Sequence, residues 1–363
     1  MMLQVWGCSQ DNGGTRGLIP VLAQLEKIGG FSLRILANGV APRFFQAAGV
    51  ENVEVCDDPT SILAEGSRPD ILVTSLDSKG SIGEKMVRAL RAENYKGAIV
   101  ALSDYPVSSA PTGGWEDIRP DWVTSGSPAN SAVIRKSWPD FPTDHIFETG
   151  FPAFDRFVGV DIGPIRAEVR QSLRLRDNQY LVAFLANVYG ATAALEVFAR
   201  VFLALESETR VAIRAHPSME SLAPEEYRSF RTVAETLHGR IVETMGVFQT
   251  DQVVSASDLV VASYSTALGE SAAQGVAGVN LAVPVMEKEY LEATQGVAPI
   301  FPWVAEGVCA EARNEEDLYK LLLEGQTGEL KKRYAAAQTA GLRLDGHSAR
   351  RVAEFILGIS AGC

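Results

Sequence analysis

Short β-prone apolar runs alternate with amphipathic segments through the first half of the chain. The runs have the length of buried strands, and the segments between them repeat apolar residues at helical spacing. Strands are predicted at residues 2–7, 31–37, 53–55, 70–74, 98–102, 120–124 and 146–149. Helices are predicted at residues 18–28, 40–48, 81–93 and 127–136. This alternation is typical of an open parallel sheet with helices on both faces.

The same pattern restarts after residues 150–155, so a second α/β half is expected. Its strands are predicted at residues 179–186, 210–214, 241–243, 259–262 and 279–284. Its helices are predicted at residues 163–173, 193–206, 267–275, 318–339 and 348–359. We therefore expect two Rossmann-like domains, residues 1–155 and 156–345, and a C-terminal helix within residues 346–363.

Composition narrows the class of protein. The chain has 363 residues, more than a single core usually spans, and 46% of them are hydrophobic while 21% are charged. The net charge of -12 argues against a binder of duplex nucleic acid or of acidic membrane surfaces, because both need an excess of Lys and Arg. A small phosphate-bearing ligand remains compatible, since helix ends and a few Arg residues suffice to bind it.

Cysteine usage and hydropathy point to a cytoplasmic protein. The four cysteines are scattered, with no CxxC pair, so neither a disulfide framework nor a zinc site is expected. The N-terminal residues lack the pattern of a signal peptide. No apolar run approaches the ~20 residues that span a bilayer.

Residues 255–284 form the most informative stretch. A predicted strand at residues 259–262 runs into a turn rich in hydroxyl groups, with Ser263, Ser265 and Thr266, and a predicted helix follows. The free N–H groups at such a helix start can bind a diphosphate. Glu270, in the first turns of that helix, could accept hydrogen bonds from a ribose diol. The alternative is ordinary N-capping of a helix that binds nothing.

A second candidate loop lies between the first strand and the first predicted helix. Residues 9–17 read SQDNGGTRG, and Gly13 and Gly14 would let a ligand approach the backbone. Arg16 adds a forked donor for phosphate or carboxylate. The loop matches neither GxGxxG nor the Walker pattern, so a flexible connecting loop stays open as the alternative.

Five segments in order resemble the GT-B superfamily, the nucleotide-sugar glycosyltransferases and the non-hydrolysing UDP-N-acetylglucosamine 2-epimerases. They are GGTRGLIPVLAQL, PDWVTSGSPANSAVI with TGFPAFDRF, IRAHPS, SDLVVASYSTALGESAAQG and DGHSARRVAEFIL. The resemblance covers nearly the whole chain. It implies two domains facing across a cleft, with the acceptor on the first, the nucleotide on the second, and the terminal helix packed back toward the first.

The resemblance also implies roles for particular residues of the second half. Glu270 would hold the ribose, Ser265 and Thr266 would meet phosphate, and His216 would lie near the diphosphate or the sugar. Residues 245–248, including Phe248, would line the base. Residues 187–191, which contain Asn187 and Tyr189, would close over the diphosphate. A structural role for His216 is the alternative.

The reaction is less well defined, because neither acidic motif of the epimerases is complete. Asp77 and Asp104 stand at the corresponding strand ends, in the segments SLDS and LSDY. Epimerisation by elimination and re-addition needs acid and base groups on both sides of the sugar, whereas inverting transfer needs one base. We therefore rank glycosyl transfer first, with epimerisation or hydrolysis as an alternative and a non-catalytic sugar-nucleotide-binding protein as a third reading.

Three carboxylates are candidates for the catalytic base, namely Asp11, Asp77 and Asp104, and Asp11 is favoured for its glycine-rich loop. Each could instead be a loop or N-cap residue. Arg16 and Arg214 could offset the charge of the leaving group, or they could be surface residues. Tyr105 and Trp303, which lie in predicted loops, could stack on a sugar.

No bound metal and no cofactor are expected, because no cluster has the spacing of metal ligands. The expected substrates are a nucleotide-diphospho-sugar, with a UDP-sugar favoured, and a saccharide or lipid-linked acceptor. A homodimer is left open, and the sequence selects neither the sugar nor the acceptor.

Overall fold

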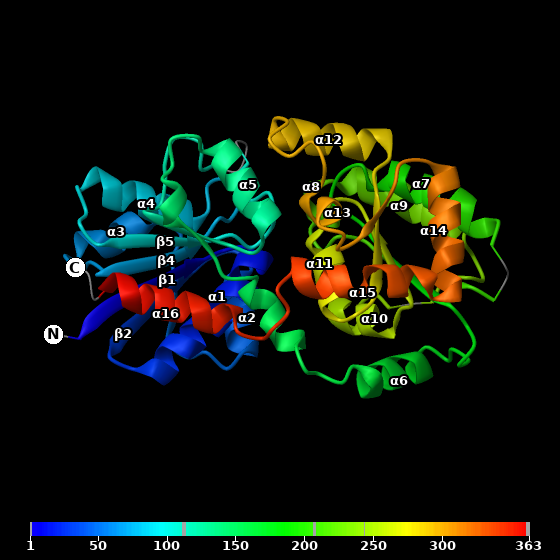
Figure 1. The fold of residues 1–363 in the computed structure, drawn as a ribbon, viewed down its shortest axis with the longest axis horizontal. Helices are drawn as coiled ribbons and strands as arrows, with labels where there is room; N and C mark the ends of the chain where they lie inside the picture. Colours follow the sequence, from blue (N-terminus) through cyan, green and yellow to red (C-terminus); the bar gives the residue numbers. More distant parts are fainter. Residues whose placement is uncertain (1, 111–113, 206–207, 243, 361–363) are drawn as a thin grey trace. The chain divides into compact units, whose positions relative to one another are not determined.

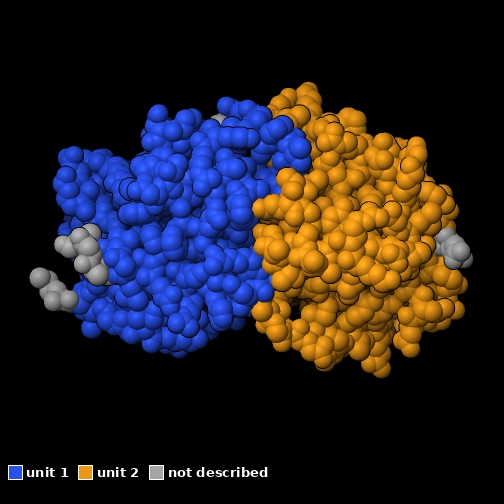
Figure 2. Space-filling view, viewed as in Figure 1, with its two compact units in different colours: residues 1–156, 293–302, 342–363 blue, residues 157–292, 303–341 orange. Residues whose placement is uncertain are grey.

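The computed structural model describes residues 2–110, 114–205, 208–242 and 244–360. The chain divides into two compact units, which Figure 2 colours separately. Unit 1 contains residues 1–156, 293–302 and 342–363, and unit 2 contains residues 157–292 and 303–341. Residues 293–302, which the sequence analysis assigned to the second domain, thus belong to unit 1.

Unit 1 is built on a seven-stranded sheet in the order β3-β2-β1-β4-β5-β6-β7. All neighbouring strands pair in parallel. The strands are β1 Leu3–Ser9, β2 Phe31–Ala37, β3 Val53–Val55, β4 Ile71–Ser75, β5 Ala98–Leu102, β6 Trp122–Ser125 and β7 Ile146–Glu148. The helices are α1 Asn12–Ile28, α2 Ala41–Ala47, α3 Pro59–Ala64, α4 Ile82–Ala92, α5 Pro128–Ser137 and α16 Ser348–Ser360. Because β2 and β4 flank β1 on opposite sides, the chain direction across the sheet reverses between β1 and β4.

The C-terminal helix α16 packs beside α1 on one face of this sheet (Figure 1). Val352, Ala353 and Ile356 share a buried apolar cluster with Val21 and Leu25 of α1. The carboxylate of Asp155 accepts hydrogen bonds from the first backbone N–H groups of α16, at 3.1 Å from Ser348 and 2.7 Å from Ala349. The carboxylate accepts from N–H groups that have no partner within the helix, and its negative charge interacts favourably with the positive end of the helix dipole. It therefore fixes the start of α16 within unit 1.

Unit 2 is built on a five-stranded parallel sheet in the order β12-β11-β10-β8-β9. The strands are β8 Leu181–Leu185, β9 Arg210–Arg214, β10 Leu259–Ala262, β11 Ala277–Leu281 and β12 Ala310–Ala312. The first helices are α6 Gly163–Ser172, α7 Ala191–Leu203, α8 Met219–Leu222, α9 Pro224–Glu235 and α10 Thr250–Ala256. The later ones are α11 Thr266–Ala273, α12 Pro284–Thr294, α13 Pro302–Ala305, α14 Glu315–Thr327 and α15 Glu329–Gly341; α12 ends and α13 begins within the 293–302 segment of unit 1. The chain direction across this sheet reverses between β8 and β10.

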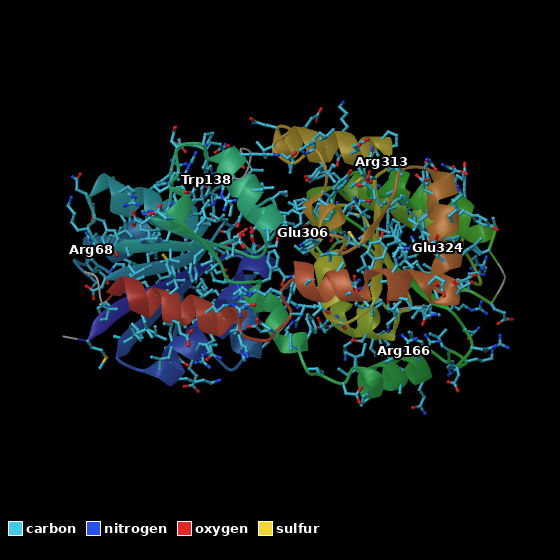
Figure 3. All side chains as sticks on the ribbon, viewed as in Figure 1. Arg68, Trp138, Arg166, Glu306, Arg313 and Glu324 are labelled. Carbon is cyan, nitrogen blue, oxygen red and sulfur yellow. The ribbon has the colours of Figure 1, made fainter. Side chains whose placement is uncertain are left out.

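Arg166, labelled in Figure 3, ties helix α6 to the segment that leads into β10. Its guanidinium donates to the carbonyl oxygens of Ala256 and Ser257, at 2.9 and 2.7 Å, and to the carboxylate of Asp258 at 2.5 Å. The other oxygen of Asp258 accepts the N–H of Leu181, 2.8 Å away. A planar donor with several N–H groups can satisfy the carbonyl groups left open at the end of α10, so α6 holds the strand register here.

The fold class expected from the sequence is confirmed, since both units are parallel α/β sheets with helices packed on them. Some element predictions were wrong. Residues 241–243 were expected as a strand, but the described part forms an isolated bridge from Ile241 to Val211; residue 243 lies outside the described residues. The helix expected at 318–339 is two helices, because Gly328 adopts a left-handed backbone between α14 and α15.

No helix in the described part of the chain combines the length and the apolar character needed to cross a membrane.

Candidate functional site

Three aspartates of unit 1 follow three neighbouring strands of the sheet. Asp11 comes two residues after β1, Asp77 two residues after β4, and Asp104 two residues after β5. The carboxyl ends of parallel strands share one edge of a sheet, so these side chains gather where α/β sites form. The charges of Asp11 and Asp104 raise the pKa of Asp77, and the charge of Asp11 raises the pKa of Asp104, as expected for carboxylates that lie close together.

Helix α1 begins at Asn12, not at Leu18 as the sequence analysis expected, so Gly13 and Gly14 lie in its first turn. A Cβ atom at Gly14 would overlap the side chains of Asp77 and Ser75, and one at Gly13 would overlap Oδ2 of Asp104. Both glycines are therefore needed to let the protein's own carboxyl groups approach the helix. The predicted contact of Gly13 and Gly14 with a ligand stays a prediction.

Asp77 is the most enclosed of the three, with an exposed fraction of 2%. Its Oδ2 accepts the backbone N–H of Gln10 at 2.8 Å, and its Oδ1 accepts the hydroxyl of Ser75 at 2.6 Å. Burial, followed by the negative charges of Asp11 and Asp104, raises the pKa of Asp77 to about 8. Asp77 therefore carries a proton for much of its time at neutral pH and has little access to a substrate.

Asp104 is half-buried and is thus more exposed than Asp77. Burial raises its pKa to about 6, and a hydrogen bond from the Ser108 hydroxyl, at 2.9 Å from Oδ1, acts in the opposite direction. A partly accessible carboxyl group that titrates near neutrality can both take up and return a proton. This makes Asp104 the best general acid or base of the three.

Asp11 is the N-cap residue of α1, and its side chain is held by the loop after β4. Its Oδ2 accepts the backbone N–H of Ser78 at 2.7 Å and also the Ser78 hydroxyl. These two donors hold the carboxylate of Asp11 in place. Its predicted role as the favoured catalytic base is therefore less well supported than that of Asp104.

Arg16 lies one helical turn beyond Asn12 on α1. Its Nε donates to Oδ1 of Asn12 at 2.8 Å, and its guanidinium carbon stands 5.3 Å from the ring centre of Phe44. These contacts hold the guanidinium on the side of α1 that carries α2. Its predicted interaction with a phosphate stays a prediction.

In unit 2, the turn between β10 and α11 is held tightly by its neighbours. The carbonyl of Ser263 accepts from Nδ2 of Asn187 at 2.8 Å, and its hydroxyl donates to the carbonyl of Leu281 at 2.7 Å. Asn187 follows β8 and Ser263 follows β10, so this contact lies where the sheet order reverses. The structure thus brings two of the predicted phosphate-site residues together.

Tyr264 occupies a left-handed conformation in this turn, with φ of 46°, which costs free energy for a residue with a Cβ. Its backbone N–H donates to Oδ1 of the fully buried Asn280 at 2.7 Å. Its ring stacks on Tyr290, with centroids 4.1 Å apart. Neither Asn280 nor Tyr290 was predicted, because both lie distant in sequence and match no motif.

The start of α11 leaves backbone donors available. Ser265 is its N-cap, and Thr266 is its first residue and is exposed. Among the described residues, no acceptor is found for the backbone N–H groups of Ser265 and Thr266. Free N–H groups at a helix start favour an anion. Glu270 lies one turn further along the same helix and is half-buried.

The start of α7 is different, because a carboxylate of the protein already occupies it. Oε1 of Glu226 on α9 accepts the backbone N–H of Thr192 at 2.8 Å. Tyr189, in the loop before α7, is 56% exposed. Glu226 was missed by the sequence analysis, since a glutamate in a distant helix gives no local signal. Of the two helix starts, α11 is therefore the better anion site.

The remaining predicted residues of unit 2 lie around the end of β9. His216 is exposed, and its Nδ1 accepts the backbone N–H of Ser218 at 3.2 Å, so its neutral ring carries the proton on Nε2. Arg214 donates to the carbonyl of Thr244 at 2.8 Å, and the backbone N–H of Phe248 donates to the same carbonyl at 3.2 Å. This contact places Phe248 close to the end of β9.

Aromatic residues proposed to stack on a sugar are mostly inaccessible. Trp303 is fully buried, so the expectation that it contacts a sugar was wrong. Tyr105, beside Asp104, is half-buried and packs at 6.0 Å from Phe301, which belongs to the 293–302 segment of unit 1. Tyr105 remains the aromatic residue best placed for contact with a ligand of the aspartate group.

Across the described ranges, no group of three or more His, Cys, Asp or Glu side chains is arranged to hold a metal ion.

No protein-family model and no curated protein matches the chain, whereas many solved structures share its fold. One is a putative UDP-N-acetylglucosamine 2-epimerase from Listeria monocytogenes, with 15% identity, a TM-score of 0.70, and coverage of 100% of this chain and 98% of that one. Another is the S. aureus MnaA–UDP complex, with 12% identity, a TM-score of 0.71, and coverage of 99% and 98%. A third is the wall teichoic acid polymerase TagF, with 11% identity, a TM-score of 0.60, and coverage of 100% and 90%.

The chain therefore has the GT-B fold, as its sequence motifs indicated. The structures that share it include both epimerases and a polymerase. At these levels of identity the similarity defines the fold and leaves the reaction to the residues of the site.

Proposed function

We propose that this protein is an enzyme that performs acid–base chemistry on a nucleotide-diphospho-sugar, with Asp104 as the group that exchanges the proton. The observation that carries the proposal is the carboxyl group of Asp104, half-buried at the edge of the unit 1 sheet with a pKa of about 6. A group with such a pKa is available in both protonation states near neutral pH. Asp77 is too enclosed for this role, and Asp11 is held by Ser78.

The nucleotide is assigned to unit 2, at the turn between β10 and α11. The free N–H groups of Ser265 and Thr266 suit a diphosphate, and Glu270 on the same helix suits the ribose hydroxyl groups. UDP is the favoured nucleotide, because a structure of the same fold contains UDP. The assignment keeps the residues expected from the sequence and adds Asn280 and Tyr290 as their support.

Epimerisation beside the anomeric carbon fits the aspartate group best. The reaction removes the proton from the carbon beside the anomeric carbon and expels the nucleotide diphosphate. The diphosphate then adds back in its original configuration, while a proton is returned to the opposite face of the neighbouring carbon. Asp104 follows β5 and can exchange the proton, while Asp11, held by Ser78 after β1 at the same edge of the sheet, offers a second carboxylate in a fixed position. Similarity to a putative UDP-N-acetylglucosamine 2-epimerase over the whole chain agrees with this choice.

Glycosyl transfer is the second candidate, and the burial of Asp77 favours it. If Asp104 acts alone, one general base remains, and one base is what inverting transfer to an acceptor hydroxyl requires. TagF, a polymerase, has the same fold.

Incubation of the purified protein with UDP-N-acetylglucosamine and no acceptor separates the two reactions. Epimerisation yields the 2-epimer of the same nucleotide sugar, detected by ¹H NMR. Transfer leaves the donor unchanged until an acceptor is added. A protein that fails to bind any of the UDP-, GDP-, CMP-, dTDP- and ADP-sugars in a thermal-shift panel would contradict both candidates, because a bound substrate stabilises the folded state by mass action.

A further inference from the structure

The first residues of the loop after β5, which carry Asp104, are fixed at several points. After β5 it passes through Asp104, Tyr105 and Pro106 and turns back at Ser108, whose backbone N–H donates to the carbonyl of Tyr105 at 3.0 Å. The fully buried Asn130 of α5 donates from Nδ2 to the carbonyl of Pro106 at 3.0 Å. The loop therefore presents Asp104 from a defined backbone.

The hydroxyl of Ser108 contacts both the carboxylate and the backbone of this loop. Its Oγ lies 2.9 Å from Oδ1 of Asp104 and accepts the backbone N–H of Tyr105 at 3.0 Å. It also lies 2.5 Å from the carbonyl oxygen of Tyr105. A hydroxyl has a single proton, so it can donate either to Asp104 or to that carbonyl.

The hydroxyl of Ser103 leaves the Ser108 hydroxyl proton available for a hydrogen bond to Asp104. Ser103, which is 3% exposed, donates to the same carbonyl of Tyr105 at 3.1 Å. The carbonyl is then satisfied without Ser108. When Asp104 is ionised, the charge-assisted bond from Ser108 is the stronger choice, and the Tyr105 N–H completes the hydroxyl's bonds.

The second oxygen of Asp104 lies on the other side, against the first turn of α1. A side chain at Gly13 would overlap Oδ2, so this oxygen has little room to move. The negative charge of Asp11, at the start of α1, acts on Asp104, and the charge of Asp104 acts in turn on Asp77, after β4. Both are carboxyl groups, so Ser108 supplies a polar proton where the neighbouring charges are negative.

We propose that Ser108 is a positioning residue for Asp104: its hydroxyl holds one carboxyl oxygen and thereby orients the other for proton transfer. The role in a reaction rests on the proposed function, but the hydrogen bond and its effect on Asp104 can be measured without any substrate. Ser108 follows no recognised motif, and the signal in the sequence is a serine four residues after the aspartate.

The adjacent Ser109 provides a matched control. It is fully buried in the same loop, and among the described residues its hydroxyl has no hydrogen-bond partner. Ser108→Ala and Ser109→Ala therefore remove the same atom from neighbouring positions, but only the first removes a bond to Asp104. Ser108→Thr restores the hydroxyl.

The experiment is a ¹³C NMR titration of the aspartate carboxyl carbons in the ligand-free protein, with the Asp104 signal identified by its absence in Asp104→Asn. Loss of a hydrogen bond to the ionised form should move the titration of Asp104 upward by about one pH unit in Ser108→Ala. Ser109→Ala should titrate like the wild type, and Ser108→Thr should lie closer to the wild type than Ser108→Ala does. Equal midpoints for Ser108→Ala and the wild type overturn the proposal, as does an equal displacement in Ser109→Ala.

A pH profile of kcat/KM connects this bond to the reaction. With ionised Asp104 as the base, the acidic limb of this profile should also move upward by about one pH unit in Ser108→Ala. An altered titration in a protein that turns over no nucleotide sugar would refute the proposed function and leave the Ser108 bond in place. An altered titration with an unmoved acidic limb in an active enzyme would refute the positioning role alone.

Discussion

At the scale of single residues, Asp77 and Asp104 show how burial separates two carboxyl groups that look alike in the sequence. Each stands two residues past a strand, with a serine beside it. Asp77 is enclosed beneath the first turn of α1, and its pKa rises to about 8, whereas Asp104 is half-buried with a pKa of about 6. The sequence identified both residues but could not rank them, because their exposure depends on a helix start that it misplaced.

Asp104→Asn should lower kcat/KM about 100- to 10,000-fold, because the amide cannot exchange a proton as the carboxyl group does. Asp77→Asn replaces an enclosed acid by an isosteric amide and should cost much less. Steady-state kinetics with the nucleotide sugar that stabilises the protein most would measure both. A larger loss in Asp77→Asn than in Asp104→Asn would reverse these assignments.

Asp77 should also make folding stability depend on pH. Its pKa of about 8 lies above the unfolded value of about 3.9, so the folded state binds more protons between these values. The free energy of unfolding should therefore fall as pH rises from 5 to 8, by at most about 1.4 kcal/mol per pH unit for this group. Urea unfolding of Asp77→Asn should show a shallower decline over the same range, and a decline as steep as that of the wild type would contradict the raised pKa.

At the scale of elements, the first turn of α1 packs directly against the side chains of Asp77 and Asp104. Its two glycines are occupied by the carboxyl groups of Asp77 and Asp104, so the turn is part of how the protein arranges its own acids. At Gly17, on the same helix, an added Cβ atom would meet no neighbouring atom within 4 Å. Substitution at the two kinds of position should therefore have opposite effects.

Gly14→Ala should destabilise the protein by about 1–3 kcal/mol, because the added methyl group must displace the buried side chains of Asp77 and Ser75. Gly17→Ala should stabilise it by about 0.5–1 kcal/mol, since alanine favours a helix and meets no neighbour here. Urea unfolding monitored by circular dichroism would measure both. Similar stabilities for the two variants would show that Gly14 is not needed for the carboxyl groups to approach.

Elements with a strong local signal could be predicted from the sequence. The strands at residues 31–37, 53–55, 98–102 and 210–214 were predicted with the bounds that the structure has. The start of α1 was missed because Asn12, Gly13 and Gly14 have the composition of a loop. The left-handed Tyr264 was missed because a Cβ disfavours that conformation, and it is supported by Asn280 on another strand.

At the scale of the whole molecule, each unit gathers a different chemistry at the carboxyl edge of its own sheet. Unit 1 gathers three carboxyl groups after β1, β4 and β5. Unit 2 gathers a turn with free N–H groups after β10 and places Asn187 against it from the end of β8. The order of motifs along the chain was enough to predict the fold, which depends on the repeated strand–helix pattern. The support of this turn by Asn280 and Tyr290, and the occupation of the start of α7 by Glu226, involve side chains from distant segments, so they required the structure.

Glu270→Ala should weaken the binding of UDP about 10- to 100-fold, because it removes a charged acceptor for the ribose hydroxyl groups. Glu225→Ala is a suitable control, since the Glu225 side chain is 91% exposed on another helix of unit 2. Isothermal titration calorimetry with UDP measures both affinities. An affinity unchanged by Glu270→Ala would remove Glu270 from the nucleotide site.

The most direct test of the proposed acid–base chemistry is the incorporation of deuterium from D₂O into UDP-N-acetylglucosamine, followed by ¹H NMR with no acceptor present. We expect the wild-type protein to exchange the hydrogen on the carbon beside the anomeric centre, and we expect Asp104→Asn to slow this exchange at least about 100-fold. Retention of that hydrogen by a wild-type protein that transfers the sugar to an acceptor would contradict epimerisation. Equal exchange by the wild type and Asp104→Asn would contradict the role of Asp104.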